Sequence, residues 1–323
     1  MLMNNDMLSG IAFGPVPSRR LGRSLGINNI PPKYCSYSCI YCQLGRNQKL
    51  INKRQQFYDP YALVEKINEK IQEVHKNNEL IDYLSFVPDG EPTLDINLGI
   101  TIKLLKKTGI KIAVITNSSM LSDAQAREDL MDADWVSLKV DTVREKTWHV
   151  VNRPHKFLDL KTIQNGMIKF ARDFNGIKAT ETMLVNGFNT DKGELKDSAD
   201  FIMNLNADIS YISIPIRPPA EKHAVSPDER CVNMAYQIFS DKIRNVECLT
   251  GHEGDDFVRT GNAADDILNI SSVHPMREDS IKILLSKAGS DWSVIEELIR
   301  ENKLLEIKYN SIKFYLRRFN KLV

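Results

Sequence analysis

The sequence predicts an α/β protein with a small additional module at its C-terminal end. Two observations support this prediction: short runs rich in apolar β-forming residues alternate with amphipathic stretches, and this pattern changes after about residue 216. With 323 residues, of which 42% are hydrophobic and 26% charged, the chain is long enough for one large α/β domain and a smaller appendage.

Six strands are expected in the first two thirds of the chain. They cover residues 24–30, 81–87, 110–117, 134–140, 177–185 and 208–216. Apolar residues at helical spacing place helices between them, at 60–76, 96–109, 122–132, 160–174 and 192–206. Strands that alternate with helices pair in parallel through right-handed crossovers. The architecture is therefore either a barrel-like or an open α/β sheet.

Several motifs directly follow the predicted strands. They are the cysteine-rich loop after residue 30, PDGEPT after residue 87, TNSS after residue 115 and DT after residue 140. In parallel α/β folds, the loops at the carboxyl ends of the strands converge and form the ligand site. We therefore expect these motifs to form one site.

A separate domain is expected at residues 263–323, after a larger domain at residues 1–262. Two short helices, at 277–289 and 291–302, precede a hairpin at 304–319, which suggests a winged-helix-like module. In this hairpin the basic residues Lys308, Lys313, Arg317 and Arg318 alternate with aromatic residues, which can favour RNA binding. Packing of the aromatic residues in the domain core is the favoured interpretation, and docking of a protein substrate by strand addition is a third.

Charge and hydropathy limit the partners. Forty-three Lys and Arg residues balance forty-two Asp and Glu residues, for a net charge of +1, so contact with nucleic acid must be local. No stretch approaches the roughly 20 apolar residues of a membrane span, and the first residues lack the pattern of a signal peptide. We expect a cytoplasmic protein that does not contact a membrane.

The segment CSYSCIYC places Cys35, Cys39 and Cys42 within eight residues, whereas Cys231 and Cys248 stand apart. This spacing is poor for a disulfide framework and improbable for ordinary core cysteines. A structural zinc site would need a fourth ligand, and the nearest downstream histidine lies in a predicted helix. An iron-sulfur cluster fits best, because three thiolates on four irons leave one iron open.

CSYSCIYC resembles the signature C-x3-C-x-aromatic-C of the radical S-adenosylmethionine (SAM) enzymes. DGEP, at residues 89–92, lies one strand later, where that superfamily has a Gly-Gly-Glu-Pro-like turn; here Asp89 replaces the first glycine. The preceding segment GPVPSRRLGRSLGIN is similar to the branch that includes the tRNA wyosine-synthesis enzymes. The resemblance covers about residues 20–220 and implies a partial (β/α)6 barrel of the radical SAM type.

The resemblance also implies the chemistry of an iron-sulfur oxidoreductase. A 4Fe-4S cluster, reduced by a partner such as flavodoxin or ferredoxin, would cleave SAM to a 5'-deoxyadenosyl radical that abstracts hydrogen from the substrate. Cys35, Cys39 and Cys42 would bind three irons, and the fourth iron would chelate the amino and carboxylate groups of SAM. Tyr41 would shield the cluster near the adenine.

Further SAM contacts are expected along the rim. The turn with Gly90, Glu91 and Pro92 would meet the SAM amino group. Thr116, Asn117 and Ser118 would bond the ribose or carboxylate, or cap the following helix. Lys139 and Asp141 form a charged pair at the end of the fourth predicted strand, with a surface ion pair as the alternative.

Four arginines complete the set of candidates. Lys139 and Arg153 are the candidates for the SAM carboxylate, although Arg153 also reads as a solvated loop residue. Arg19 and Arg20 suggest a loop salt bridge more than an anion site. Arg217 is a candidate substrate contact, because it follows the last predicted strand.

A tRNA nucleoside is the first expected substrate. The alternatives are a protein or peptide substrate, or a non-catalytic iron-sulfur regulator that binds DNA through the winged helix. The wyosine enzymes carry additional cysteines upstream of the triplet, and this chain has none before Cys35, which argues against wyosine synthesis itself.

Overall fold

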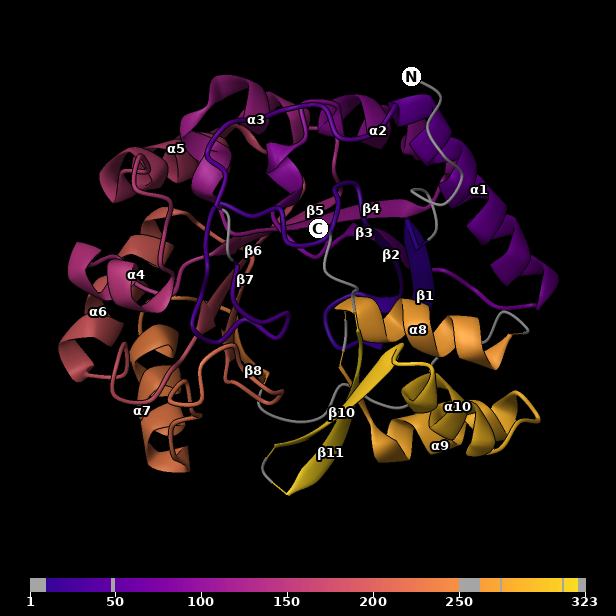
Figure 1. Ribbon diagram of the computed structural model, residues 1–323. Helices are drawn as coiled ribbons and strands as arrows, with labels where there is room; N and C mark the ends of the chain where they lie inside the picture. Colours follow the sequence, from indigo (N-terminus) through magenta and orange to yellow (C-terminus); the bar gives the residue numbers. More distant parts are fainter. Residues whose placement is uncertain (1–9, 48–49, 250–261, 274, 310, 319–323) are drawn as a thin grey trace.

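The computed structural model describes residues 10–47, 50–249, 262–273, 275–309 and 311–318. Its main body is an eight-stranded sheet in the order β1 to β8, with helices covering its outer face (Figure 1). The strands are β1 (Ala12–Ser18), β2 (Gly22–Ile27), β3 (Tyr83–Phe86), β4 (Lys111–Thr116), β5 (Trp135–Lys139), β6 (Ile177–Met183), β7 (Ile209–Ser213) and β8 (Val246–Leu249).

The sheet is curled into a partial barrel. Strand β1 pairs antiparallel with β2, and every later pair from β2 to β8 is parallel. Strands that are neighbours in the sheet are also neighbours in sequence. An open doubly wound sheet has a point at which the strand order reverses, and this sheet has none. The structure thus confirms the barrel-like alternative, and the six predicted strands correspond to β2–β7.

Two strands of the sheet were not predicted. Strand β1 has the sequence AFGPVPS, whose glycine and two prolines indicate a turn, and its register with β2 shifts between Phe13 and Val16. Strand β8 is only four residues long, too short to show a clear strand pattern. Both strands lie at the edges of the sheet, where pairing on one side imposes a weaker sequence pattern.

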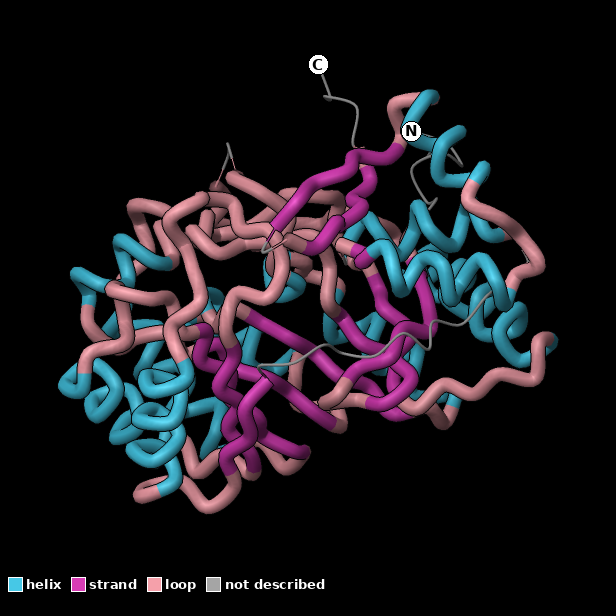
Figure 2. Tube along the Cα trace, turned by 90° about the horizontal axis from the view of Figure 1, so that it is seen from below, coloured by secondary structure: helices cyan, strands magenta, loops and turns pink. Residues whose placement is uncertain are grey.

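The outer helices follow the predicted order, and their apolar faces pack against the sheet. They are α1 (Pro60–Lys76), α2 (Leu98–Leu105), α3 (Ala124–Asp129), α4 (Glu145–Val151), α5 (Leu160–Asp173), α6 (Lys192–Asn204) and α7 (Glu229–Ser240). Helix α4 was not predicted. Seen from below, the strands run through the middle of the molecule and the helices flank them (Figure 2).

Side chains alternate between the two faces of the parallel strands. Outward residues such as Val114 and Val136 join the large core under the helices, whereas Ala113 and Trp135 belong to a separate inner cluster. Leu21, from the turn between β1 and β2, is also part of this inner cluster. Apolar packing therefore closes one end of the barrel and leaves the opposite end for a site.

The C-terminal segment has its own hydrophobic core. It consists of α8 (Ala263–Val273), β9 (Met276–Arg277), α9 (Glu278–Lys287), α10 (Ser293–Arg300), β10 (Leu304–Tyr309) and β11 (Ile312–Arg317). The three strands form an antiparallel sheet in the order β10-β11-β9, and the element order is that of a winged helix. Helix α8 and strand β9 were not predicted.

The hairpin of this segment uses its aromatic side chains for packing. Phe314 and Tyr315 are buried, so they present no face on which a base could stack. Lys313 pairs with Glu306 and Glu278. Core packing is therefore the correct interpretation for these two aromatic residues.

Within the residues described here, no helix combines the length and apolar character needed to cross a membrane.

Candidate functional site

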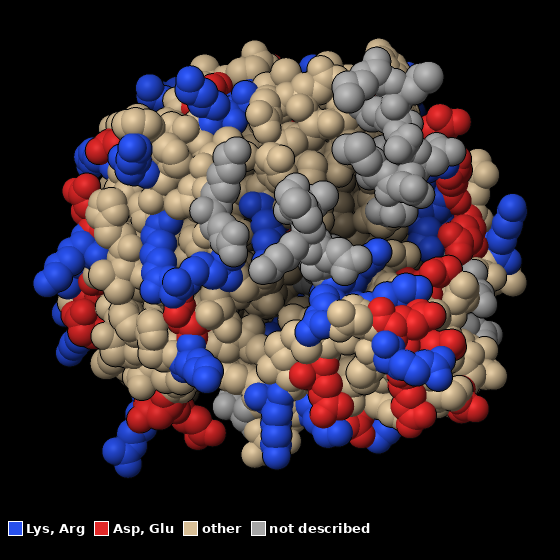
Figure 3. Space-filling model, viewed as in Figure 1, with Lys and Arg blue, Asp and Glu red and all other residues tan. Residues whose placement is uncertain are grey.

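A pocket of about 310 Å³ opens inside the barrel at the carboxyl ends of the strands. The face shown in Figure 3 is hollowed near its centre, with basic side chains in and around the hollow. The chemically active residues that line the pocket are Arg19, Arg20, Cys35, Cys39, Tyr41, Cys42, Gln43, Glu91, Thr116, Asn117, Lys139, Glu181, Ser213 and Arg217.

The loop carrying the cysteines is fixed by pairing with a distant segment. The amide of Ser38 donates to the carbonyl of Asn152 at 3.1 Å, and the amide of Ile40 donates to the carbonyl of Val151 at 2.9 Å. In return, the amide of His155 donates to the carbonyl of Ser36 at 2.8 Å. Residues 151–155, which follow α4, thus act as a clamp on residues 36–40.

The three thiols share one buried environment. Burial raises the pKa of Cys35 well above its usual value, with a further rise from the neighbouring Cys39. Burial also raises the pKa of Cys39 to about 12 and that of Cys42 above its usual value. Three thiolates can lie this close together only beside a strong positive charge. A bound metal centre supplies that charge, and the thiols that bind it lose their protons.

The donor set bears on the kind of metal centre. Cys35, Cys39 and Cys42 all line one pocket. In a 4Fe-4S cluster each cysteine binds a different iron, so the thiolates must face one cavity without meeting at one point. Three thiols that line one cavity fit such a cluster.

The DGEP turn lies directly against the cysteine loop. The amide of Glu91 donates to the carbonyl of Tyr34 at 3.0 Å, and the amide of Lys33 donates to the carbonyl of Asp89 at 2.6 Å. A Cβ atom at Gly90 would lie 1.9 Å from the carbonyl oxygen of Tyr34. Only glycine permits this approach, so the turn positions the residue just before Cys35.

The carboxylate of Glu91 joins this turn to the end of β4. It accepts hydrogen bonds from the Thr93 amide at 3.0 Å, the Thr116 hydroxyl at 2.6 Å and the Asn117 amide at 2.6 Å. Burial raises the pKa of Glu91, although these hydrogen bonds act in the opposite direction. Because both oxygens already have partners in the protein, Glu91 braces the pocket wall.

Asp89 is buried behind the turn, and among the residues that the structure describes its Oδ1 atom has no hydrogen-bond partner. Burial raises the pKa of Asp89 to about 8, against the opposing effect of Lys33 and Arg317. In the unfolded chain an aspartate titrates near pH 3.9, so the folded protein holds an extra proton between about pH 4 and pH 8. The stability contributed by this group is complete below about pH 4 and is lost as the pH rises towards 8.

Asp89→Asn is therefore expected to stabilise the cluster-free protein at high pH. We expect a gain of about 1 to 3 kcal/mol at pH 8.5 that shrinks steadily towards pH 5, because the variant avoids ionising a buried group. Thermal melts at a series of pH values measure the effect. Asp82→Asn is the control, since Asp82 is paired with Arg23 and has a lowered pKa, and it should give no gain. A gain that is independent of pH would contradict the prediction.

Thr116 ends β4, and Asn117 and Ser118 directly follow it. Thr116 and Asn117 line the pocket. The Oδ1 atom of Asn117 also accepts a hydrogen bond from the amide of Ser119 at 2.9 Å, whereas the cap residue of the following helical turn, Ser118, makes no side-chain cap hydrogen bond. Ser118 has a positive φ of 69° and its hydroxyl donates to the carbonyl of Lys139 at 3.4 Å, so it lies behind the wall.

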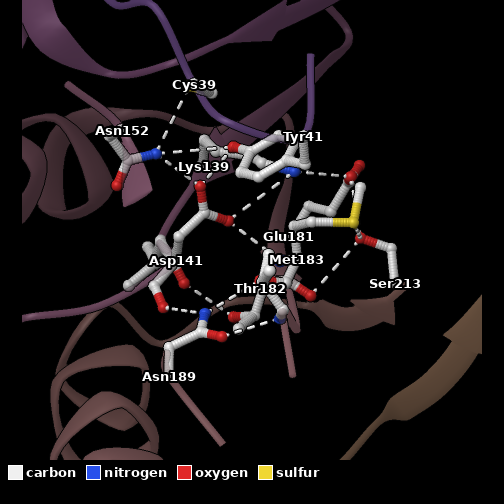
Figure 4. Close-up of polar contacts among 12 residues, drawn as sticks. Cys39, Tyr41, Lys139, Asp141, Asn152, Glu181, Thr182, Met183, Asn189 and Ser213 are labelled. Carbon is white, nitrogen blue, oxygen red and sulfur yellow. Dashed lines mark hydrogen bonds and ion pairs between the residues drawn. The ribbon is translucent and has the colours of Figure 1, made fainter. Parts of the chain in front are cut away.

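Charged side chains form a network across the pocket floor (Figure 4). Lys139 of β5 lies beside its register partner Glu181 of β6, with a distance of 2.8 Å between Nζ and Oε1, and 3.7 Å from Asp141. Arg20 reaches Glu181 from the turn between β1 and β2. Burial would lower the pKa of Lys139, yet the two carboxylates raise it above its usual value. Lys139 and Arg20 likewise hold the pKa of Glu181 well below its usual range, despite its burial.

Lys139→Met is expected to destabilise the fold by about 3 kcal/mol, because it removes one partner of a buried ion pair. Chemical unfolding at pH 7 measures the change in the free energy of unfolding. Lys106→Met is the matched control, since Lys106 forms an exposed pair with Asp134 whose loss should cost under about 1 kcal/mol. Equal effects of the two substitutions would show that the buried network contributes no more than a surface pair.

Asp141 supports the cysteine loop from below. One carboxylate oxygen accepts hydrogen bonds from the Tyr41 hydroxyl and, at 2.6 Å, from the side-chain amide of Asn152. The other accepts from the amide of Met183 at 2.9 Å. The Nζ atom of Lys139 lies 5.2 Å from the centre of the Tyr41 ring. Tyr41 is thus held at the pocket wall from both its ring and its hydroxyl.

The structure brings most of the predicted residues together. The three cysteines, Tyr41, Gly90, Glu91, Thr116, Asn117 and Lys139 line one pocket. Pro92, Ser118 and Asp141 lie outside its lining, although Asp141 contacts Tyr41. Arg153, the other candidate for the SAM carboxylate, also lies outside the lining and forms an ion pair with Glu221.

Two residues of the site were not predicted. Glu181 is the acidic residue of IKATETM, and its position in the alternation with Ala179 and Met183 could have placed it inside the barrel. Asn152 precedes the candidate Arg153 and has no such signal, because its role depends on the clamp. Arg217, the candidate substrate contact, lines the pocket, and so do Arg19 and Arg20, for which a loop salt bridge was favoured.

Comparisons with known proteins agree with this geometry. The sequence profile described as the radical SAM superfamily matches residues 29–214. Over 309 residues the chain is 44% identical to the UPF0026 protein MJ1312 of Methanocaldococcus jannaschii, which covers 95% of this chain and 96% of that protein.

Two solved structures show the same fold at low sequence identity. The structure of TYW1 with a lysine-pyruvate adduct bound has a TM-score of 0.54 and 14% identity, covering 68% of this chain and 74% of that one. A radical SAM methyltransferase from Sphaerobacter thermophilus has a TM-score of 0.54 and 11% identity, covering 71% and 67%.

Proposed function

The chain belongs to the radical SAM superfamily, and from this premise we propose that it is an enzyme whose Cys35, Cys39 and Cys42 hold a 4Fe-4S cluster. The observation that carries the proposal is that these three thiols line one buried pocket at the carboxyl ends of the barrel strands. When bound, the reduced cluster supplies one electron to the sulfonium of SAM, whose cleavage gives a 5'-deoxyadenosyl radical that removes hydrogen from the substrate.

The pocket wall next to the cysteines is the proposed SAM site. Gly90, Thr116 and Asn117 line it with backbone and small polar groups, and Tyr41 closes one side. Lys139 is the candidate for the SAM carboxylate, in competition with Glu181 and Asp141, which it already contacts. Glu91, in the pocket wall, holds Thr116 and Asn117, and Asp141, outside the lining, holds Tyr41. Apolar side chains such as Val87, Ile115 and Met183 line the same pocket and exclude water from a reactive intermediate.

Anaerobic reconstitution tests this proposal. We expect about four irons and four sulfides per chain, an electron paramagnetic resonance signal after reduction, a change in that signal on adding SAM, and release of 5'-deoxyadenosine. Reduced flavodoxin or ferredoxin is the proposed physiological electron donor and should replace dithionite. Tightly held zinc without iron would refute the cluster, and a reduced cluster that never cleaves SAM would support a regulator instead.

A tRNA nucleoside is the first substrate that we propose to test. Arg19 and Arg217 line the pocket from different loops, so cationic groups stand where a nucleic-acid backbone could be neutralised. A peptide is the second candidate, because β10 is an edge strand to which an extended chain could add. Mass spectrometry of tRNA nucleosides from cells with and without the protein distinguishes them: a nucleoside that disappears supports tRNA, and an unchanged set supports the peptide.

A further inference from the structure

Two asparagine amides point at the sulfur atoms of the cysteine loop. The Nδ2 atom of Asn117 lies 3.5 Å from the Sγ atom of Cys35, and the Nδ2 atom of Asn152 lies 3.5 Å from the Sγ atom of Cys39. The two donors come from separate elements: Asn117 directly follows β4, and Asn152 forms the C-cap of α4. Figure 4 shows Asn152 between Cys39 and the carboxylate of Asp141.

The orientation of the Asn152 amide is fixed by its other contacts. Its Nδ2 atom lies 2.6 Å from the Oδ2 atom of Asp141. A carboxylate only accepts hydrogen bonds, so the atom facing it must be the amide nitrogen. That nitrogen carries two hydrogens, one for Asp141 and one for Cys39. The Asn152 backbone carbonyl also accepts from the amide of Ser38, so the whole residue is fixed to the cysteine loop.

Asn117 is fixed equally well. Its Oδ1 atom accepts from the amide of Ser119 at 2.9 Å, which leaves the Nδ2 atom to face the cysteine loop. Nδ2 donates to the hydroxyl of Ser36 at 3.0 Å as well as to Cys35. The backbone amide of Asn117 donates to Glu91 at 2.6 Å. Both amides are therefore held in place without any contribution from a ligand.

Hydrogen bonds to cluster sulfurs are among the factors that set the reduction potential of an iron-sulfur cluster. A one-electron reduction places more negative charge on the thiolate ligands, so an N–H donor stabilises the reduced form more than the oxidised form. We propose that Asn117 and Asn152 raise the reduction potential of the cluster through these two hydrogen bonds. This inference rests on the proposed function, since it requires a cluster on Cys35, Cys39 and Cys42.

Removing one donor should make the cluster harder to reduce. The full-length protein is reconstituted without SAM and poised at the midpoint potential of the unsubstituted protein. At this potential, Asn152→Leu and Asn117→Leu are each expected to lower the ratio of reduced to oxidised cluster about tenfold. For a one-electron couple this is a fall of about 59 mV. Dithionite titration followed by electron paramagnetic resonance measures it.

Asn189→Leu is the matched control. Asn189 is also buried beside Asp141, and its Nδ2 atom donates to the backbone carbonyl of Asp141 at 2.8 Å, but it has no contact with a cysteine sulfur. Its substitution should leave the midpoint potential unchanged. Leucine variants that retain iron and titrate at the original potential would overturn the proposal, and so would a fall of equal size in Asn189→Leu.

A measurement on the unsubstituted protein covers the case in which a leucine variant loses iron. With asparagine labelled by ¹⁵N at the side-chain amide, pulsed electron paramagnetic resonance of the reduced cluster should show weak ¹⁵N coupling from nearby amides. Absence of that coupling would overturn the inference.

The two proposals can fail separately. A cluster that forms and shifts in potential without ever cleaving SAM refutes only the proposed enzyme. Cleavage of SAM with unmoved potentials refutes only the role of the asparagines.

Discussion

Replacing any one of Cys35, Cys39 and Cys42 with alanine is expected to eliminate the cluster and reduce 5'-deoxyadenosine formation by more than about 100-fold. Loss of a group that merely supports a metal ligand costs about 10- to 100-fold, and loss of a ligand should exceed that range. The two remaining thiols are partly buried, and this burial raises their pKa, so they are poor thiolate donors without the complete metal centre. Iron content and product formation are the measurements.

Cys231→Ala and Cys248→Ala are the controls for the cysteine series. Both residues are partly buried free thiols that lie outside the pocket lining. They should retain the iron content and product formation of the unsubstituted protein. Full iron retention in any one of the three loop variants, or equal losses in the control variants, would contradict the assignment of the ligands.

Gly90→Ala is expected to have the second largest effect. The added Cβ atom would lie 1.9 Å from the carbonyl oxygen of Tyr34 and 2.8 Å from its carbonyl carbon, and both are backbone atoms that cannot rotate away. The DGEP turn and the cysteine loop would have to move apart, and this movement would break the hydrogen bond from the Glu91 amide to the carbonyl of Tyr34. We expect a destabilisation of about 3 kcal/mol, at the upper end for overpacking, and loss of most of the iron.

Gly193→Ala tests whether any added methyl group would do the same. Gly193 lies in the first turn of α6, and the atom nearest to its added Cβ is the terminal Nη2 of Arg144 at 2.9 Å, which can move. The free energy of unfolding of this variant should lie within about 1 kcal/mol of that of the unsubstituted protein, and the higher helix propensity of alanine favours a gain in stability. Chemical unfolding and iron analysis compare the two variants, and similar results for both would refute the steric argument.

The sequence was sufficient to predict the β/α units because the parallel strands carry strong local signals. Runs such as IAVI belong to central strands that are covered on both faces, and β2–β7 were all predicted. The two edge strands could not be predicted, because β1 contains prolines and β8 is short, and an edge strand needs fewer apolar residues than a central one. The choice between a barrel and an open sheet depends on which strands are neighbours, and the spacing of hydrophobic residues does not encode that order.

A site residue could be predicted from the sequence when it belongs to a short contiguous motif, but not when its role depends on contact with a distant segment. The three cysteines and the DGEP turn are short contiguous motifs, and all three cysteines line the pocket. Asn152 contacts Cys39 only because residues 151–155 pair with residues 36–40, a relation between distant segments that no local pattern reveals. The neighbouring Arg153 was a candidate for the SAM carboxylate because of its charge, but its side chain pairs with Glu221.

The clamp between residues 36–40 and residues 151–155 also constrains the order of biosynthesis. Ser38 and Asn152 are 114 positions apart, so a nascent chain exposes its thiols long before their supporting partner leaves the ribosome. Closing a loop of this length has an entropic cost that the intervening β/α units must first offset by folding. Loading of the proposed cluster should therefore follow translation of at least the first half of the protein, because until then the cysteine loop lacks the segment that holds it.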